Sequence, residues 1–133
     1  EYIVIHCSAT KPSMDIGLSE IRNWHVNERG WRDVGYHYVI KRNGEVELGR
    51  NIQDTGAHAA GYNSKSIGIC LVGGMAEDNS AEDNFTDKQW AALLDLIKQK
   101  LTDYPEAKVI GHNEISKKDC PCFDVQKWKE DNL

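Results

Sequence analysis

The carboxyl-terminal third of the chain contains a short stretch whose side chains could bind a transition metal. His112 directly follows residues 109–111, an apolar run typical of a strand end, and Cys120 and Cys122 follow after a short polar segment. Imidazole and thiolate groups are common protein ligands of zinc. Zinc needs four donors, or three protein donors and one open position. A site in this stretch therefore needs a further ligand from elsewhere in the chain.

The best candidate for that ligand lies at the other end of the sequence. His6 directly follows residues 2–5, a β-branched and aromatic run, just as His112 follows its own apolar run. If both strands run in one direction within one sheet, their imidazoles meet at the edge where open α/β sheets place their sites. Cys120 would then be the third ligand. The fourth position would be left to water, which is the pattern of catalytic zinc sites.

Two further side chains could assist chemistry at such a metal. Lys118 precedes Cys120 by two residues, and alternate residues of an extended segment share a face. Its ammonium would stabilise negative charge that develops during attack on a carbonyl. Tyr36 follows Gly35 at the expected start of a strand, and its hydroxyl could hold the attacking water or donate to an oxyanion. The alternatives are a solvated surface lysine, as expected for Lys117, and an aromatic core residue.

The other histidines and cysteines have less specific patterns. His58 lies in a loop rich in glycine and alanine, a composition that fits either a ligand groove or a plain exposed loop. Cys7 and Cys70 are expected to be small core residues. Cys122 is ambiguous, because its thiolate could compete for the same metal.

The elements that would position these residues are strands alternating with helices. Short apolar or alternating runs predict strands at residues 2–5, 36–41, 45–48, 66–72 and 108–111. Helical spacing of apolar residues predicts helices over 18–29, from a cap at Thr86 and, briefly, after Asp124. We therefore expect one α/β domain over residues 1–133, with a central mixed β-sheet flanked by helices on both faces.

Local signals add detail to two of the predicted strands. Asn43-Gly44 predicts a tight hairpin, and the alternation of the return strand places Val46 and Leu48 inward. Strand 66–72 is apolar almost throughout, so we expect it at the centre of the sheet and covered on both faces.

The helices carry capping signals. Gly30 is placed to end the first helix in the left-handed conformation that glycine favours. Thr86 and Gln89 have the spacing of a capping box, and Phe85 and Trp90 have the spacing of a hydrophobic staple. Together these signals fix where the second long helix begins.

Composition excludes several classes of function. The chain has 133 residues and a formal net charge of −5, which argues against binding to nucleic acid or to anionic membranes. No apolar run approaches the roughly 18 residues of a membrane span. Four unevenly spaced cysteines do not predict a disulfide scaffold, and a reducing compartment fits them better. We expect a monomer, and a regulatory protein partner stays unknown at this point.

Several motifs, in order over essentially the whole chain, resemble one known family. They are residues 6–12 (HCSATKP), 20–25 (EIRNWH), 30–37 (GWRDVGYH), 66–74 (SIGICLVGG) and 120–124 (CPCFD). This set resembles the zinc-dependent type 2 N-acetylmuramoyl-L-alanine amidases, a family that includes phage lysozymes. Animal peptidoglycan recognition proteins (PGRPs) share its fold.

The resemblance implies one zinc ion (Zn2+) per chain, bound by His6, His112 and Cys120. It implies that Tyr36 and Lys118 are the catalytic pair, which agrees with the residues selected above from strand ends and loops. The reaction would be attack of an activated water on an amide in peptidoglycan, the one that joins the lactyl group of N-acetylmuramic acid to L-alanine.

The resemblance further implies a peptidoglycan groove that includes His37, His58 and Asn63. It also implies a phage or prophage endolysin, made in the host cytoplasm and released at lysis to act on the periplasmic cell wall. The sequence opens without a charged leader, an apolar signal region or Met, so its start does not reveal whether the protein is exported. One departure from the family pattern is Cys122, where the phage lysozymes have a small hydroxyl residue.

Two other classes of function remain open at this stage. A recognition domain would bind the muropeptide without cutting it, but the non-catalytic members of this family characteristically lack the cysteine ligand. This chain has Cys120 as well as Tyr36 and Lys118. A structural zinc site would need a fourth protein ligand, and Cys122 is the nearby candidate.

Overall fold

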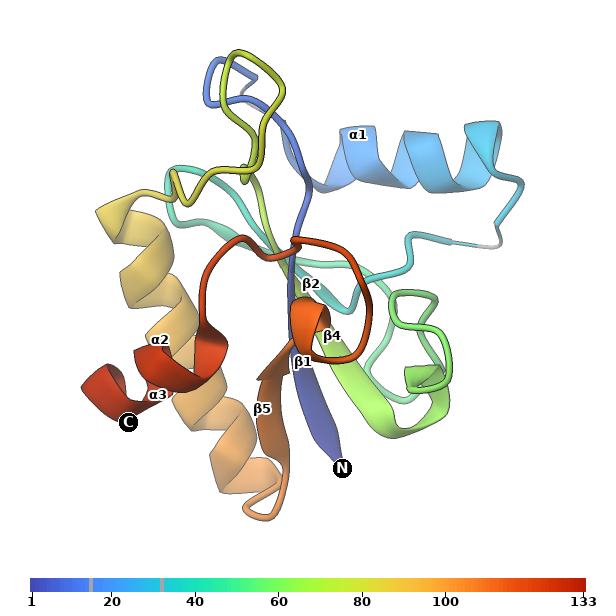
Figure 1. Ribbon diagram of the computed structural model, residues 1–133. Coiled ribbons are helices and arrows are strands. Elements are labelled where there is room, and N and C mark those ends of the chain that lie inside the picture. The colour runs from blue at the N-terminus through green and yellow to red at the C-terminus, as the bar shows by residue number, and fades with distance from the viewer. Residues whose placement is uncertain (15, 32) are drawn as a thin grey trace.

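A mixed five-stranded β-sheet lies at the centre of the molecule and has helices on both faces (Figure 1). The computed structural model describes residues 1–14, 16–31 and 33–133. The strand order is β3–β2–β4–β1–β5. The strands are β1 (Tyr2–Cys7), β2 (Tyr38–Ile40), β3 (Val46–Leu48), β4 (Ser66–Leu71) and β5 (Lys108–Gly111). Strand β3 pairs antiparallel with β2 and the other pairs are parallel, which confirms the predicted mixed α/β sheet.

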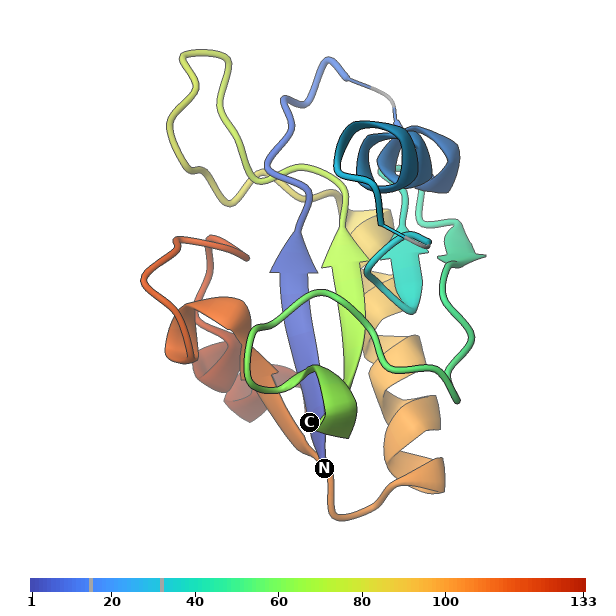
Figure 2. The same cartoon turned by 90° about the vertical axis from the view of Figure 1, so that its right-hand side faces the viewer.

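The helices divide between the two faces of the sheet (Figures 1 and 2). Helices α2 (Asp87–Asp103) and α3 (Val125–Asn132) pack on one face, and α1 (Leu18–Asn23) packs on the other. Helix α1 continues into a π-helical turn (Trp24–Glu28), so the second half of the predicted helix 18–29 is wound more widely than an α-helix. Gly30 then adopts a φ of 73°, as predicted for the end of this helix. Within the described residues, none of the helices is both long and apolar enough to cross a membrane.

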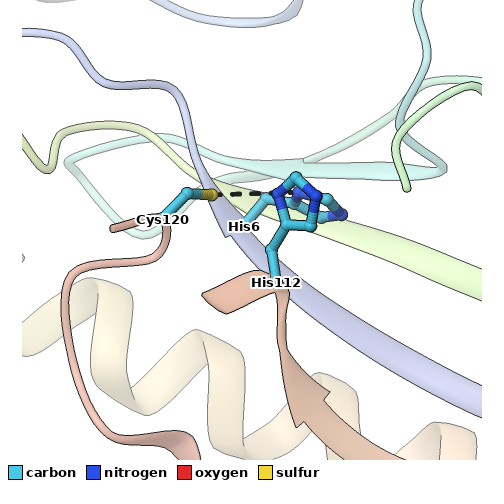
Figure 3. Close-up of side chains that lie close together, drawn as sticks. All are labelled: His6, His112 and Cys120. Atoms are coloured by element: carbon cyan, nitrogen blue, oxygen red, sulfur yellow. Dashed lines mark hydrogen bonds between the residues drawn. The ribbon is translucent and has the colours of Figure 1, made fainter. Parts of the chain in front are cut away.

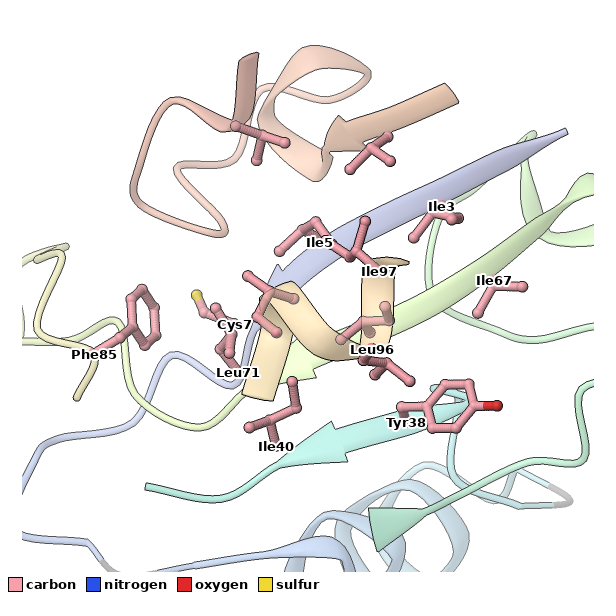
Figure 4. Close-up of a cluster of buried hydrophobic side chains, with 14 residues drawn as sticks. Ile3, Ile5, Cys7, Tyr38, Ile40, Ile67, Leu71, Phe85, Leu96 and Ile97 are labelled. Atoms are coloured by element: carbon pink, nitrogen blue, oxygen red, sulfur yellow. The ribbon is translucent and has the colours of Figure 1, made fainter. Parts of the chain in front are cut away.

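Alternate residues of the central strands divide the core into two layers. Ile3 and Ile5 of β1 pack toward α2, together with Ile69 and Leu71 of β4 (Figure 4). Cys70 of β4 points the other way and joins the cluster beneath α1. Strand β4 is therefore covered on both faces and lies at the centre of the sheet, as its apolar sequence predicts.

The predicted orientation of the hairpin's return strand is wrong. Val46 and Leu48 are 39% and 70% exposed. Their neighbour Glu47 faces the protein instead, and its Oε1 accepts a hydrogen bond of 2.8 Å from the backbone N–H of Leu18. This carboxylate serves the first turn of α1, whose N-cap residue Gly17 has no side chain to do so. The hydrogen bond that the first turn of α1 makes with Glu47 therefore determines which face of this edge strand is turned toward the protein.

The amino terminus of α2 has both features that the sequence predicts. The Thr86 hydroxyl oxygen accepts a hydrogen bond from the backbone N–H of Gln89. The side-chain oxygen of Gln89, Oε1, accepts one from the backbone N–H of Thr86. This is a complete capping box. Phe85 and Trp90 pack edge to face with ring centroids 5.6 Å apart, which confirms the hydrophobic staple.

The same glutamine also joins the helix to the sheet. Gln89 is fully buried, and its Nε2 donates to the carbonyl oxygens of Ile40 and Val72, at 3.1 and 2.9 Å. These two carbonyls lie at the ends of β2 and β4. One side chain therefore satisfies polar groups of the helix end and of two strand ends at once.

We expect Gln89→Leu to lower the free energy of unfolding by about 2–3 kcal/mol, because it removes the acceptor of the Thr86 N–H and two buried hydrogen bonds donated to the carbonyl oxygens of Ile40 and Val72. Gln99→Leu is the matched control, since Gln99 is an exposed glutamine of the same helix and its replacement should cost less than about 0.5 kcal/mol. Urea denaturation of both variants measures the difference. Equal stability of the two variants would contradict this role.

Candidate metal centre and active-site cavity

The pairing of β1 with β5 brings two histidines together. The strands run parallel, and Ile5 lies opposite Gly111. The next residues are therefore His6, still within β1, and His112, which opens a short 3₁₀ turn (His112–Glu114). Their ring centroids are 4.5 Å apart, and the side chains are 1% and 9% exposed. The expectation that both imidazoles meet at one sheet edge agrees with this geometry.

Cys120 completes a cluster of three possible metal ligands (Figure 3). One donor atom from each of His6, His112 and Cys120 lies within 4.8 Å of the other two. The Cys120 Sγ is 3.9 Å from His6 Nδ1 and accepts a hydrogen bond of 3.1 Å from the backbone N–H of Cys7. Two imidazoles and one thiolate are a donor set that suits zinc.

The surroundings of the cluster favour the neutral form of its imidazoles. Burial lowers the pKa of His6 well below its ordinary value, and the neighbouring His58, His112 and Lys118 lower it further. Burial also lowers the pKa of His112, again with a contribution from the Lys118 ammonium. The neutral ring, with a free nitrogen lone pair, is the form of histidine that binds metals.

The cluster lines a cavity of about 510 Å³ that also receives Tyr36 and Lys118. The Tyr36 ring lies 5.2 Å from the His6 ring, and burial raises the pKa of its hydroxyl well above the ordinary value. Lys118 lies in a bend, so the expected extended segment before Cys120 is wrong. The lysine nevertheless lines the same cavity as Cys120.

Three large side chains of this cavity were not selected from the sequence. Trp24, Arg29 and Trp31 form part of its wall, and the Arg29 guanidinium lies over the Trp31 ring, 5.3 Å from its centroid. Both tryptophans fall within or beside the motifs quoted above. Their place in these motifs was the signal that could have identified them. Their spacing alone does not distinguish tryptophans of a cavity wall from tryptophans of a core.

His58 and Asn63 line the same cavity, but polar atoms of both side chains already make hydrogen bonds within the protein. The His58 ring nitrogens lie 2.9 Å from His6 Nε2 and 3.2 Å from Ser66 Oγ. Asn63 Oδ1 accepts from the backbone N–H groups of His58 and Ala59, each at 2.8 Å. Asn63 therefore fixes the loop that carries His58.

His37 lies outside the cavity lining and is 1% exposed. Its Nδ1 accepts from the N–H of Gly68 at 3.0 Å, and its Nε2 donates to the carbonyl of Asp54 at 2.8 Å. His25 does line the cavity, but its Nδ1 likewise accepts from a backbone N–H, that of Gly35 at 2.9 Å. This geometry favours a structural role for both rings, and the groove role of His37 that the resemblance implies stays a prediction.

Cys122 lies outside the cavity of the metal cluster. Its Sγ donates to the carbonyl oxygen of Gly74 at 3.2 Å and lies 3.9 Å from the Sγ of Cys7. Burial and the nearby Cys7 raise the pKa of the Cys122 thiol to about 12. All four cysteines are free thiols, and Cys122 is the less suited of the two carboxyl-terminal ones to bind a metal as a thiolate.

Comparisons with known proteins define the class to which this fold and site belong. Residues 1–123 match the family model of N-acetylmuramoyl-L-alanine amidases, and the chain belongs to that family. The family resemblance found in the sequence motifs is thereby confirmed.

Individual relatives agree with this assignment. The endolysin of Escherichia phage T7 is 49% identical over 130 residues, covering 98% of this chain and 85% of that endolysin. Among solved structures, PGRP-SA of bumblebee superposes with a TM-score of 0.82 at 29% identity, covering 99% of this chain and 81% of the other. The N-acetylmuramoyl-L-alanine amidase LysC of Clostridium intestinale gives a TM-score of 0.78 at 27% identity, covering 90% and 74%.

We expect the chelated, metal-free protein to lose stability as the pH falls below 6.5. Burial lowers the pKa of His25 and His37 in the folded state, whereas the unfolded chain binds protons near pH 6.5. The unfolded state therefore takes up more protons than the folded state below that pH. The stability is fully present above pH 6.5 and is lost at up to about 1.4 kcal/mol per pH unit for each such histidine.

Urea denaturation between pH 7.5 and 5.5 measures this loss. His37→Asn is the matched variant, because its amide oxygen can still accept from the Gly68 N–H but does not titrate. We expect a shallower dependence on pH for this variant. A free energy of unfolding that stays constant over this range in the unmodified protein would contradict the assignment of neutral, buried histidines.

Proposed function

We propose that this protein is a zinc-dependent N-acetylmuramoyl-L-alanine amidase. It would hydrolyse the amide between the lactyl group of N-acetylmuramic acid and L-alanine in bacterial peptidoglycan. The observation that carries the proposal is the cluster of His6, His112 and Cys120 at a cavity that also receives Tyr36 and Lys118. Membership of the amidase family supports the same conclusion, and we assign the catalytic domain to residues 1–133.

The biological role that we propose is that of a phage or prophage endolysin. The support is the 49% identity to the endolysin of phage T7 over nearly the whole chain. Such an enzyme is made in the host cytoplasm and acts on the cell wall after release. Its partner is then the peptidoglycan itself.

His6, His112 and Cys120 would hold the zinc ion. Two neutral imidazoles and a sulfur that accepts a backbone N–H fit this ion in ligand type and in number for a catalytic site. Zinc in a site with three protein ligands supplies Lewis acidity, which activates water and polarises a carbonyl group. The substrate amide would lie in the adjoining cavity.

Lys118 and Tyr36 would act on the substrate carbonyl. Lys118 lines the same cavity as the cluster, and its ammonium would stabilise negative charge that develops on the carbonyl oxygen. The Tyr36 ring lies 5.2 Å from the His6 ring, centroid to centroid, in the lining of the same cavity, and its hydroxyl would donate a hydrogen bond to the same oxygen or orient the attacking water.

Digestion of purified peptidoglycan tests this function. The protein should release stem peptides with a free L-alanine amine, which mass spectrometry of the soluble fragments identifies. A chelator should abolish the release and added zinc should restore it. Muropeptides that are bound but left intact by the zinc-loaded protein would instead place the chain among recognition proteins.

In the same assay, Tyr36→Phe and Lys118→Met should each lower kcat by about 10²-fold or more, as expected for a lost donor to an oxyanion. Lys117→Met is the matched control, since Lys117 is the exposed neighbour outside the cavity lining and its replacement should leave kcat within about twofold. Zinc content is measured for each variant. Unchanged kcat in both cavity variants would refute the two roles.

A further inference from the structure

His58 is a buried imidazole at the cavity whose role the proposed mechanism leaves open. Both of its ring nitrogens are engaged, one by His6 Nε2 at 2.9 Å and the other by Ser66 Oγ at 3.2 Å. A ring with both nitrogens occupied has no free group for a ligand. Its polar contacts instead point along a chain that leads to the metal cluster.

The direction of each hydrogen bond in this chain follows from its last member. The carbonyl oxygen of Tyr62 can only accept, so the Ser66 hydroxyl donates to it, at 2.7 Å. The Ser66 oxygen is then free to accept, and His58 Nε2 must carry the proton that it donates to Ser66. In the neutral ring the other nitrogen, Nδ1, is an acceptor.

The same logic fixes the proton of His6. Because His58 Nδ1 accepts, His6 Nε2 donates and carries the ring proton. The Nδ1 of a neutral His6 is therefore bare, and this is the atom that lies 3.9 Å from Cys120 Sγ within the cluster. The Tyr62 carbonyl oxygen therefore sets, through Ser66 and His58, which nitrogen of His6 carries the proton. The lone pair of His6 Nδ1 is left to face the proposed metal position.

The protein is shaped to hold the His58 ring in this place. A Cβ at Gly68 of β4 would lie 2.6 Å from His58 Cγ, and a Cβ at Gly56 would lie 2.6 Å from His58 Cδ2. Neither distance is compatible with a side chain at these positions, so the two glycines leave the room that the ring fills. Asn63 Oδ1 holds the backbone N–H of His58 itself.

We propose that His58 is a positioning residue that holds His6 in the Nε2–H tautomer and in the ring orientation that presents Nδ1 to zinc. This inference rests on the proposed function, because it needs His6 to be a zinc ligand. Partners that orient a ligating histidine in this way typically contribute 10- to 100-fold in metal affinity. His58 then acts on the reaction through His6, without touching the substrate.

Zinc affinity of the folded protein, measured by competition with a chromophoric chelator, tests the inference. His58→Leu should bind zinc about 10- to 100-fold more weakly. His58→Asn should recover most of this loss, because its amide oxygen can accept from His6 Nε2–H near the position of the ring Nδ1. Circular dichroism and thermal unfolding establish that each variant is folded.

Ser66→Ala removes the acceptor of His58 Nε2–H and should weaken zinc binding in the same direction. Ser64→Ala is its matched control, since Ser64 is an exposed serine two residues away and should leave the affinity unchanged. Cys120→Ser shows how far zinc affinity falls when a proposed ligand itself is removed, and the other variants are compared with it.

A spectroscopic measurement on the unmodified, zinc-loaded protein keeps the inference testable if the variants fail to fold. Long-range 1H–15N correlation should show His6 protonated at Nε2 and His58 protonated at Nε2. A coupling through the hydrogen bond should join His6 Nε2 to His58 Nδ1. A proton on His58 Nδ1 would overturn the inference.

The outcomes separate this inference from the function on which it rests. Absence of stoichiometric zinc in the unmodified protein would overturn the proposed function itself. Zinc binding by the unmodified protein and by His58→Leu with equal affinity would overturn the positioning role alone. Equal weakening in His58→Leu and His58→Asn would also overturn it, because the effect would then come from packing of the ring.

Discussion

The parallel pairing of β1 with β5 is the constraint on which the rest of the site depends. With Ile5 opposite Gly111, the residues that follow each strand leave the sheet side by side, and both are histidines. A shift of register by one residue would turn one imidazole to the opposite face of the sheet. Ile3 and Ile5 are completely buried and Val109 nearly so, which holds the register through packing against α2. The geometry of the possible metal site is therefore set by aliphatic contacts on the opposite face.

The two faces of β1 have different tasks. Its odd-numbered side chains fill the core beneath α2, whereas His6 faces the cavity on the other side. Two glycines on that side have no side chain and so permit close approach of the loop. A Cβ at Gly35 would lie 2.2 Å from the carbonyl oxygen of Ala57, and a Cβ at Gly68 would lie 2.6 Å from His58 Cγ. Small residues at these positions let the loop that carries His58 settle on the sheet edge. The packed core beneath α2 fixes the position of β1, and the glycines on the opposite face leave space for the His58 ring beside His6.

Much of this arrangement could be predicted from the sequence, and the failures have physical causes. Strand ends, capping boxes and the zinc-binding types of side chain are local signals, so the five strands and the grouping of His6, His112 and Cys120 could be found. The orientation of Val46 and Leu48 could not, because both faces of an edge strand can be solvated and the deciding partner was a distant helix end.

The contacts of His58 were hidden for a different reason. They join residues 52 and 8 positions apart in the sequence, through a loop whose small residues have no periodicity. Composition places such a loop at the surface, and it does not show which way a ring within the loop turns. The bend at Lys118 is hidden in the same way, since alternation predicts residues on a shared face only in extended chain.

The choice between two neighbouring thiols follows from what each sulfur already contacts. Cys120 Sγ accepts a hydrogen bond of 3.1 Å from the backbone N–H of Cys7 and lies 3.8 Å from the Cys7 carbonyl oxygen. Cys122 Sγ faces the carbonyl oxygen of Gly74, which favours the protonated thiol that donates to it. Binding to zinc requires a thiolate, and the raised pKa of the Cys122 thiol makes Cys122 the less suited of the two cysteines for the proposed ion. An added thiol close to the cluster is thus compatible with three candidate ligands, because the Cys122 sulfur contacts Gly74 and lies outside the cavity that the cluster lines.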